Sequence, residues 1–390
     1  MKIKKLIPAG LWILSLVGIS IKGGPITYGF FAVATLIPLI LLGYIFLVFW
    51  LLKIYQKMEG RSQVCDQNTD FYFTLQNESF IAFSGVRVTF FSNFSTISGL
   101  DDGNEYELMP HEGISLKTGL SCKYRGSYEV GVRDIIISDF WNIFSISFKN
   151  KNTLSAVVFP KIVHLANMNG SFMAAVCERE SKMKKNDVDV FNREYVYGDE
   201  VRLMQWKASA GKGKLFVRER TGEEEPGAAL IMDSCRYGLE EEEFLPIENK
   251  LLELNLAISC YLLKKNIPVR NFYLNSGKIA GSRMGNLSAF DAFYAEMCAF
   301  SFSSVNENRI LAEGIRNCNE IRNSHLVVIM VHSLTQEMMN LAVGYADEGI
   351  PVMLYLVSDA PRPETEMAAG CRNIEFLCIR TDADLLEVLQ

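Results

Sequence analysis

The chain has 390 residues, a length that indicates two or three domains rather than one. Its formal net charge is −6, but the first sixty residues carry six lysines and one glutamate, +5, so the remainder carries −11. An acidic body argues against a broad nucleic-acid-binding surface and suits a neutral or basic protein partner. The nine cysteines form no C-x-x-C pair, so they indicate neither a disulfide framework nor a zinc knuckle and favour a reducing compartment.

Two apolar stretches without charged residues open the chain, over residues 6–21 and 28–52. The second is long enough for a tilted membrane span, because a bilayer core needs about 20 helical residues. The first is short and needs neighbouring lysines that reach out to the headgroups. The glycine- and proline-containing segment Lys22–Thr27 between them is a turn by composition. The pattern therefore predicts a helical hairpin with transmembrane helices at about 4–21 and 28–52.

A cleaved signal peptide is the alternative interpretation of the first stretch, because a basic start precedes a short apolar run. No A-x-A-like cleavage site follows it, and a longer apolar run comes directly after, so the hairpin is preferred. Lysines flank both outer ends of the hairpin, whereas Lys22 stands alone in the turn. The positive-inside rule then places both ends, and the soluble domains, in the cytoplasm of a multi-pass membrane protein.

Two soluble regions follow the membrane segment 1–60. Residues 62–165 carry short aromatic and β-branched runs separated by Gly, Asn and Asp, which predicts an antiparallel β-sandwich. A charged linker region occupies 166–225. In 226–390, continuous apolar runs such as Leu326–Val331 alternate with helical patterns. Buried parallel strands have this character, and right-handed crossovers make such a sheet doubly wound, so we expect a multi-domain protein that ends in a Rossmann-like α/β domain.

The most distinctive stretch is R-E-Y-V-Y-G-D-E-V-R-L-M-Q-W-K-A-S-A, over residues 193–210. It resembles the signature of the family called domain of unknown function fifty-eight, R-E-Y-x-x-G-D-x-x-R-x-I-x-W-K-x-S-A-R. Upstream, Arg125–Tyr128 resembles the R-G-x-Y strand of that family, and Asp139–Phe144 stands where many members have D-P-F-G-L-F. The chain departs from the pattern at Gln205, where an acidic residue is common, and at Gly211, where arginine is usual.

Two interpretations of this signature are open. In the first it is a structural clasp, in which Trp206 fills a core pocket and Arg202 pairs with a carboxylate such as Asp199. In the second, Arg202, Lys207 and Lys212 form an anion-binding or partner-binding site. The clasp is preferred, because paired charges are often structural. The candidate partner-binding residues are Arg193, Glu194, Tyr195, Gly198, Asp199, Arg202, Trp206 and Lys207.

The resemblance also implies a von Willebrand A-like C-terminal domain, in which a D-x-S-x-S motif at the carboxyl ends of the strands often holds a metal ion. Asp233 matches the aspartate, but Cys235 and Tyr237 replace both hydroxyl ligands and Arg236 adds a positive charge. A hard divalent cation prefers oxygen ligands, so we predict a degenerate site without metal. Asp233 then serves as the cap of the next helix.

Finally, the resemblance implies operation beside a MoxR-type AAA+ ATPase in complex assembly or envelope physiology. We therefore predict a non-enzymatic scaffold without a cofactor, whose partners are the lipid bilayer, an AAA+ ATPase and other membrane proteins, and not nucleic acid. One alternative is a metal-dependent, adhesion-type ligand-binding protein that uses Asp233. Another is a hydrolase built on Cys235 and His332, although neither H-E-x-x-H nor G-x-S-x-G occurs.

Overall fold

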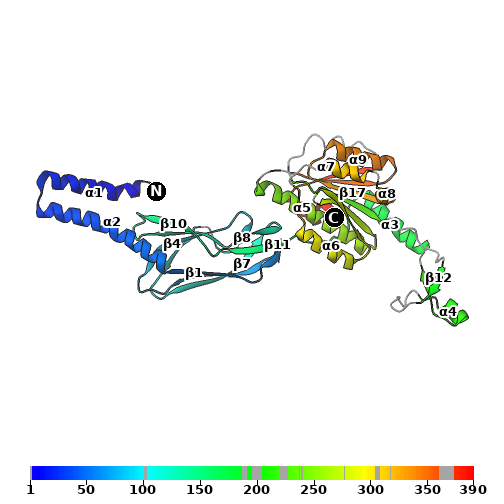
Figure 1. Ribbon diagram of the computed structural model, residues 1–390, viewed down its shortest axis with the longest axis horizontal. Coiled ribbons are helices and arrows are strands. Elements are labelled where there is room, and N and C mark those ends of the chain that lie inside the picture. Colours follow the sequence, from blue (N-terminus) through cyan, green and yellow to red (C-terminus); the bar gives the residue numbers. More distant parts are fainter. Residues whose placement is uncertain are drawn as a thin grey trace. The chain divides into compact units, whose positions relative to one another are not determined.

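The computed structural model describes residues 2–100, 103–186, 191–195, 204–219, 227–236, 238, 240–275, 277–303, 308–316, 318–359 and 373–390. The chain divides into two compact units, Met1–Lys161 and Ile162–Gln390 (Figure 1). Each unit has a hydrophobic core of its own, so each is described separately.

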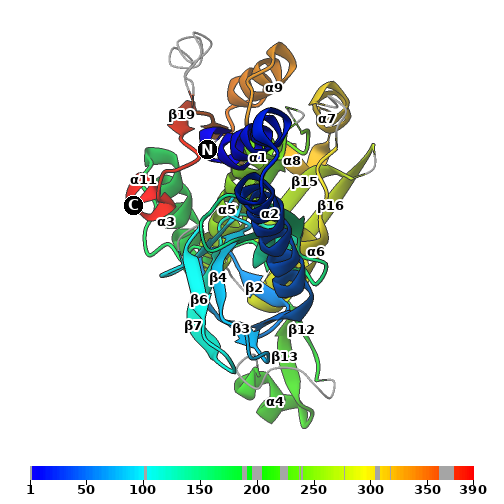
Figure 2. The same ribbon diagram turned by 90° about the vertical axis from the view of Figure 1, so that its left-hand side faces the viewer.

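The N-terminal unit begins with a helical hairpin of α1 (Lys2–Lys22) and α2 (Pro25–Leu51), which lie side by side in Figures 1 and 2. Trp12 Nε1 of α1 donates a hydrogen bond to Thr35 Oγ1 of α2 over 3.2 Å. Among the described helices, α2 is long and apolar enough to cross a membrane, with a mean hydropathy of 2.6, whereas the apolar part of α1, Pro8–Lys22, is shorter. The predicted hairpin is present, and α2 starts earlier than expected because Pro25 fits the first helical turn.

The rest of this unit is built from antiparallel strands, as predicted. One sheet has the order β1-β3-β7-β5, a second has β10-β9-β4-β6, and a third has β2-β11-β8, with β2 and β11 parallel. Alternate residues such as Phe71, Phe73 and Leu75 of β3 point into the core. The bounds are β1 Leu52–Met58, β2 Ser62–Val64, β3 Thr69–Asn77, β4 Phe83–Phe90, β5 Ser95–Ile97, β6 Glu105–Leu108, β7 Gly113–Cys122, β8 Gly126–Val130, β9 Val132–Ser138, β10 Ser145–Lys149 and β11 Leu154–Phe159.

The end of α2 is part of the sandwich rather than a separate anchor. Leu41, Ile45 and Val48 are buried, and the last two belong to the sandwich core. Their spacing of four and three residues puts them on one face of the helix. β1 starts at Leu52, directly after α2, so the β region begins about ten residues before the strand pattern of the sequence suggests.

The C-terminal unit contains a six-stranded sheet of order β16-β15-β14-β17-β18-β19, in which the edge strand β16 alone is antiparallel to its neighbour. Helices cover both faces: α3, α5, α6 and α11 pack on one, and α7, α8 and α9 on the other (Figure 1). The strands are β14 Ala228–Met232, β15 Val269–Asn275, β16 Lys278–Met284, β17 Leu326–Val331, β18 Val352–Val357 and β19 Ile374–Ile379. The helices are α3 Ser171–Asn186, α5 Glu241–Lys264, α6 Leu287–Ala299, α7 Asn308–Ile315, α8 Asn319–Arg322, α9 Gln336–Asp347 and α11 Leu385–Leu389.

Residues upstream of the strand pattern contribute to this second core. Val163, Leu165 and Met168 are buried in it, and so are Met173 and Val176 of α3. Ser171 fixes the start of α3, because its backbone N–H and its hydroxyl both donate to the Glu375 carboxylate. The α/β unit therefore begins at residue 162, well before the first parallel strand.

Candidate functional site

The signature stretch folds into a small strand–helix–strand element. β12 (Phe191–Glu194) pairs antiparallel with β13 (Phe216–Glu219), and α4 (Trp206–Lys212) lies between them in sequence. Arg193 stands opposite Val217 in this pairing, and the N–H of Tyr195 donates to the carbonyl of Leu215 over 2.8 Å. The pairing brings the two ends of the signature together.

Ser209 joins α4 to β13. Its hydroxyl is buried, donates to the carbonyl of Gln205 over 2.9 Å and accepts from the N–H of Phe216 over 2.9 Å. Gly213 ends the helix in the left-handed region, with φ of 65°, where glycine is favoured. The helix is only seven residues long, so these contacts, rather than helix propensity, hold it in place.

The structure overturns the clasp interpretation for the tryptophan. Trp206 is 62% exposed, so it fills no core pocket. The contact with β13 is made by Ser209 instead, because a hydroxyl can accept the Phe216 N–H, whereas an indole has a donor only. Lys207 is also exposed, and Glu194 forms an exposed ion pair of 2.6 Å with Lys214.

Only some of the other predicted signature residues lie within the described part of the chain. Tyr195 is half-buried, and Arg193 is described by its strand position. Gly198, Asp199 and Arg202 lie outside the described residues, so the proposed pairing of Arg202 with Asp199 stays a prediction.

A second cluster lies at the topological switch point of the parallel sheet, where the strand order reverses. The chain moves from β14 to β15 on one side and later returns to add β17 on the other side of β14. Asp233 and His332 directly follow these neighbouring strands, and Asp233 Oδ2 lies 2.7 Å from His332 Nδ1. Both side chains are buried. In open α/β sheets, ligands commonly bind at such a reversal point.

The residues around Asp233 do not fit a hard divalent cation. The second carboxylate oxygen, Oδ1, accepts the backbone N–H of Cys235 over 3.0 Å, so both oxygens already face nitrogen groups. Ser234 Oγ accepts the N–H of Leu274 over 2.8 Å. Cys235 offers a thiol where an oxygen ligand is wanted, and Tyr237 lies outside the described residues. In the described part of the chain, no three His, Cys, Asp or Glu side chains gather in an arrangement suited to a metal.

Arg236 is also committed to a structural partner. Its Nε and Nη2 contact the two carboxylate oxygens of Glu248 at 2.5 and 3.2 Å, and its guanidinium lies 3.8 Å from the centre of the Phe244 ring. A two-pronged pair stacked on an aromatic ring is a strong arrangement for arginine. It fixes the loop after β14 to the first turns of α5.

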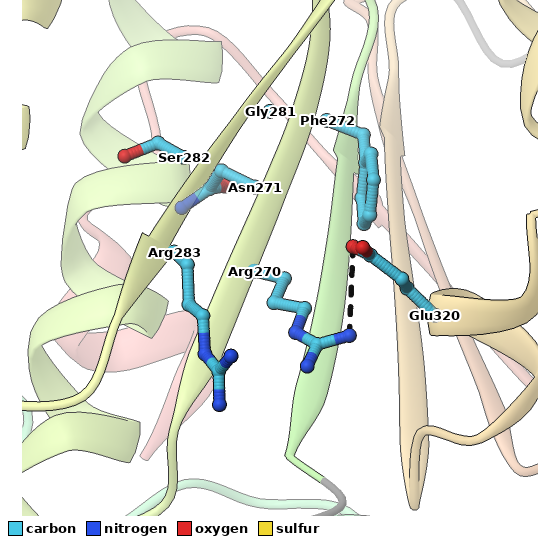
Figure 3. Close-up of a pocket in the computed structure, with 7 residues that line it drawn as sticks. All are labelled: Arg270, Asn271, Phe272, Gly281, Ser282, Arg283 and Glu320. Atoms are coloured by element: carbon cyan, nitrogen blue, oxygen red, sulfur yellow. Dashed lines mark ion pairs between the residues drawn. The ribbon is translucent and has the colours of Figure 1, made fainter. Parts of the chain in front are cut away.

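A third feature, which no sequence pattern indicates, is a polar recess of about 240 Å³ on the β15–β16 hairpin. Arg270 and Arg283 are opposite each other in the strand register, and Arg270 Nη1 lies 3.5 Å from Glu320 Oε2 of α8 (Figure 3). The two arginines are 13 positions apart in sequence, and only the hairpin pairing brings them together. The residues that line the recess are Arg270, Asn271, Phe272, Gly281, Ser282, Arg283 and Glu320.

A long apolar helix, a set of antiparallel sheets and an α/β sheet with helices on both faces define a multi-domain protein, in whose described residues one helix could span a membrane. The model of the family described as "Protein of unknown function DUF58" matches residues 192–243, which contain α4, β13, β14 and the start of α5. The match covers most of the signature, so this segment is similar to that family, as the signature predicts.

No curated protein matches the chain. Among solved structures, the CARDB domain of the PF1109 protein from Pyrococcus furiosus is 16% identical, covers 27% of this chain and 91% of its own, and has a TM-score of 0.20. A GH20 exo-β-N-acetylglucosaminidase mutant from Vibrio harveyi is 8% identical, with coverages of 79% and 57% and a TM-score of 0.19. A β-glucuronidase from Bacteroides uniformis is 10% identical, with coverages of 78% and 36% and a TM-score of 0.15. Similarities this low carry no argument about fold or function.

Proposed function

We propose that this protein is a membrane-anchored, non-enzymatic interaction protein whose signature element binds a MoxR-type AAA+ ATPase. The α1–α2 hairpin holds the chain in the cell membrane, and both soluble units lie in the cytoplasm. The C-terminal unit acts as a von Willebrand A-like domain. Its sheet order and the position of Asp233 at the reversal point support this, and the neighbours of Asp233 support a domain that works without a metal ion.

The exposure of Trp206 carries the proposal. Tryptophan is enriched among the residues that dominate protein interfaces, where burial of its large apolar side chain contributes much of the binding free energy. Here it lies beside the exposed Lys207, on a helix that Ser209 fixes to β13. Because the helix is already held in place, little conformational entropy is lost on binding. The lysine adds electrostatic attraction to an acidic patch on the partner.

Measured affinity for the purified ATPase tests this proposal. The full chain, reconstituted in nanodiscs, is titrated with the MoxR-type ATPase encoded in the same genome. Trp206→Ala should weaken the affinity about thirtyfold, which corresponds to about 2 kcal/mol for a central interface tryptophan. Lys207→Glu should weaken it less and make the remaining binding less sensitive to salt.

Leu215→Ala is the matched control, because Leu215 is an exposed apolar residue of the same element, just before β13. It should leave the affinity unchanged. Wild-type affinity in the Trp206→Ala variant would place the interface elsewhere, and no binding by the unmodified chain would contradict the partnership itself.

A further inference from the structure

We infer that one end of the β-sandwich rests in the lipid headgroup layer through a lipid-facing rim, which consists of Phe80, Met109, Phe140 and Trp141. This inference rests on the membrane anchoring proposed above and adds a second contact to it. The rim makes the bilayer a partner of the sandwich as well as of the hairpin.

Strand register places the rim residues together. Leu52, the first residue after α2, pairs with Asn77, so the end of α2 lies at the end of the sandwich that carries the β3–β4 loop. Gln76 pairs with Gly113 and Phe83 with Leu108, which brings the β6–β7 loop to the same end. β9 pairs with both β4 and β10, and this places the β9–β10 loop there too.

The rim side chains are exposed and apolar. Phe80 is 85% exposed, Met109 60%, Phe140 56% and Trp141 58%. Single exposed apolar residues are common on soluble proteins, but several on three adjacent loop tips mark an interaction surface. Aromatic residues are also the side chains that gather where a membrane protein meets the bilayer interface.

Buried polar groups hold these loops in shape. The Asp139 carboxylate accepts three backbone N–H groups, those of Trp141 at 2.8 Å, Ile143 at 3.1 Å and Phe144 at 2.6 Å. The buried Asn77 amide donates to the carbonyl of Ile81 at 2.8 Å and to that of Met109 at 2.9 Å, so it joins two of the loops. The apolar side chains are therefore displayed by loops with a fixed shape.

The position of the rim along α2 matches the thickness of a bilayer. Tyr44 of α2 donates its hydroxyl hydrogen to the carbonyl of Ala82 over 3.0 Å, and its ring centre lies 4.2 Å from that of Phe140. From Pro25 to Tyr44 the helix spans about 20 residues, or about 30 Å, the thickness of a hydrocarbon core. The rim then lies at the boundary between hydrocarbon and headgroups, where aromatic belts form.

Continuity with the anchor favours lipid over a protein partner. The apolar surface of α2 continues past Tyr44 through Phe46 to Trp50, which is 83% exposed. The first charged residue after it, Lys53, forms an ion pair with Glu78, in the loop that carries Phe80. The charged pair that ends this apolar stretch thus includes a residue of the same loop as Phe80, so apolar and charged side chains adjoin there, as they do at the interface of a membrane.

Tryptophan quenching in vesicles tests the inference. The chain has four tryptophans, at positions 12, 50, 141 and 206, so single-tryptophan variants are made by replacing the other three with phenylalanine. Each full-length variant is reconstituted in phosphatidylcholine vesicles that contain lipid brominated either near the carbonyls or near the chain ends. We expect Trp141 to be quenched by bromines near the carbonyls, to an extent comparable with the quenching of Trp12 by the deeper bromines. Trp206 is the exposed control and should respond to aqueous acrylamide alone.

The outcomes separate the two proposals. If Trp12 escapes both lipid quenchers, the membrane anchoring falls and the rim with it. If Trp12 is quenched but Trp141 responds only to acrylamide, the anchor stands and the rim inference is overturned. The unmodified chain provides an independent measurement: a photoreactive lipid should label the peptide that contains residues 139–144, and labelling confined to residues 2–51 would contradict the rim.

Discussion

The partners of Asp233 determine what this buried carboxylate does. It faces His332 Nδ1 on one side and the Cys235 N–H on the other, so it holds together the loops that follow β14 and β17. A buried charge without such partners is strongly unfavourable, and this makes the pair a structural feature of the sheet edge.

We predict that Asp233→Ala lowers the free energy of unfolding of the C-terminal unit by about 2–4 kcal/mol, because the Cys235 N–H loses its acceptor and His332 loses the carboxylate that lies against its ring. Asp233→Asn keeps an acceptor for Cys235 and should cost less. Denaturant titration with and without Mg²⁺ measures both effects. A stabilising effect of Mg²⁺ on the wild type that Asp233→Ala abolishes would instead support the metal-dependent alternative.

Gly227 is a second residue whose surroundings set its identity. A Cβ at this position would lie 2.1 Å from the backbone carbonyl oxygen of Pro268, which a change of rotamer cannot relieve. Gly227→Ala should therefore destabilise the unit by about 1–3 kcal/mol through a shift of the backbone. Gly344 in α9 is the matched control: nothing lies within 4 Å of its Cβ position, so Gly344→Ala should stabilise the unit by about 0.5–1 kcal/mol. Equal effects of the two substitutions in thermal unfolding would contradict the packing argument.

At the scale of elements, Ser209 determines whether the signature presents Trp206 in one orientation. Ser209→Ala leaves the buried Phe216 N–H without its acceptor, so the link between α4 and β13 should weaken by about 1–3 kcal/mol. Amide hydrogen exchange of Phe216 should become faster, and affinity for the ATPase should fall although Ser209 itself is buried. Ala210→Ser adds a hydroxyl at an exposed position of the same helix and should change neither quantity. Unchanged exchange at Phe216 in Ser209→Ala would refute the link.

Helix α2 has two faces with different environments. Ile45 is fully buried in the sandwich core, whereas Ile40, five residues earlier, is 63% exposed and faces the lipid in our proposal. Ile45→Ala should cost about 2–5 kcal/mol in the unfolding of the N-terminal unit, because it leaves a cavity in a packed core. Ile40→Ala should have little effect in nanodiscs, where lipid fills the space. Loss of near-ultraviolet circular dichroism on heating measures both, and equal midpoints would argue that α2 is not part of the sandwich.

Elements with a strong local pattern were the ones that the sequence predicted well. The apolar run of α2, the alternating β3 and the continuous β17 each carry their burial pattern in their own residues. The start of the C-terminal unit at residue 162 could not be predicted in this way. Val163, Leu165 and Met168 belong to a short segment that His164 and Asn167 interrupt, and they are buried only because the sheet that they contact forms far along the chain.

The candidate sites also combine features that local sequence predicts with features that depend on distant parts of the chain. Family resemblance located the signature, but not the exposure of Trp206, which depends on Ser209 taking the contact with β13. The apolar run before Asp233 predicted that this residue would lie at a strand end. Only the strand order of the folded sheet brings His332 to it, across 98 intervening residues. The rim of the sandwich escaped prediction because its residues come from three separate loops that only the register of the strands brings together.

At the scale of the whole molecule, buried tyrosines make stability depend on alkaline pH. Burial raises the pKa of Tyr128 in the sandwich and those of Tyr273, Tyr345 and Tyr355 in the α/β unit above the usual 10. A nearby Glu296, which accepts the hydroxyl hydrogen of Tyr273, raises the pKa of that tyrosine further. Both units are affected, so the whole chain should respond to alkali.

The direction follows from proton binding. Below about pH 10 these phenols are protonated in both states, so they add no pH dependence. Above it, the unfolded chain loses the protons while the folded chain keeps them, and the free energy of unfolding falls as pH rises toward the raised values. Denaturant titrations between about pH 9 and pH 11 should show this decline, with tyrosinate absorbance appearing as the chain unfolds. Tyr345→Phe should flatten it and also lose the hydrogen bond of 2.7 Å to the carbonyl of Ile315. If all tyrosines titrate near pH 10 in a chain that stays folded, their burial does not control the alkaline stability.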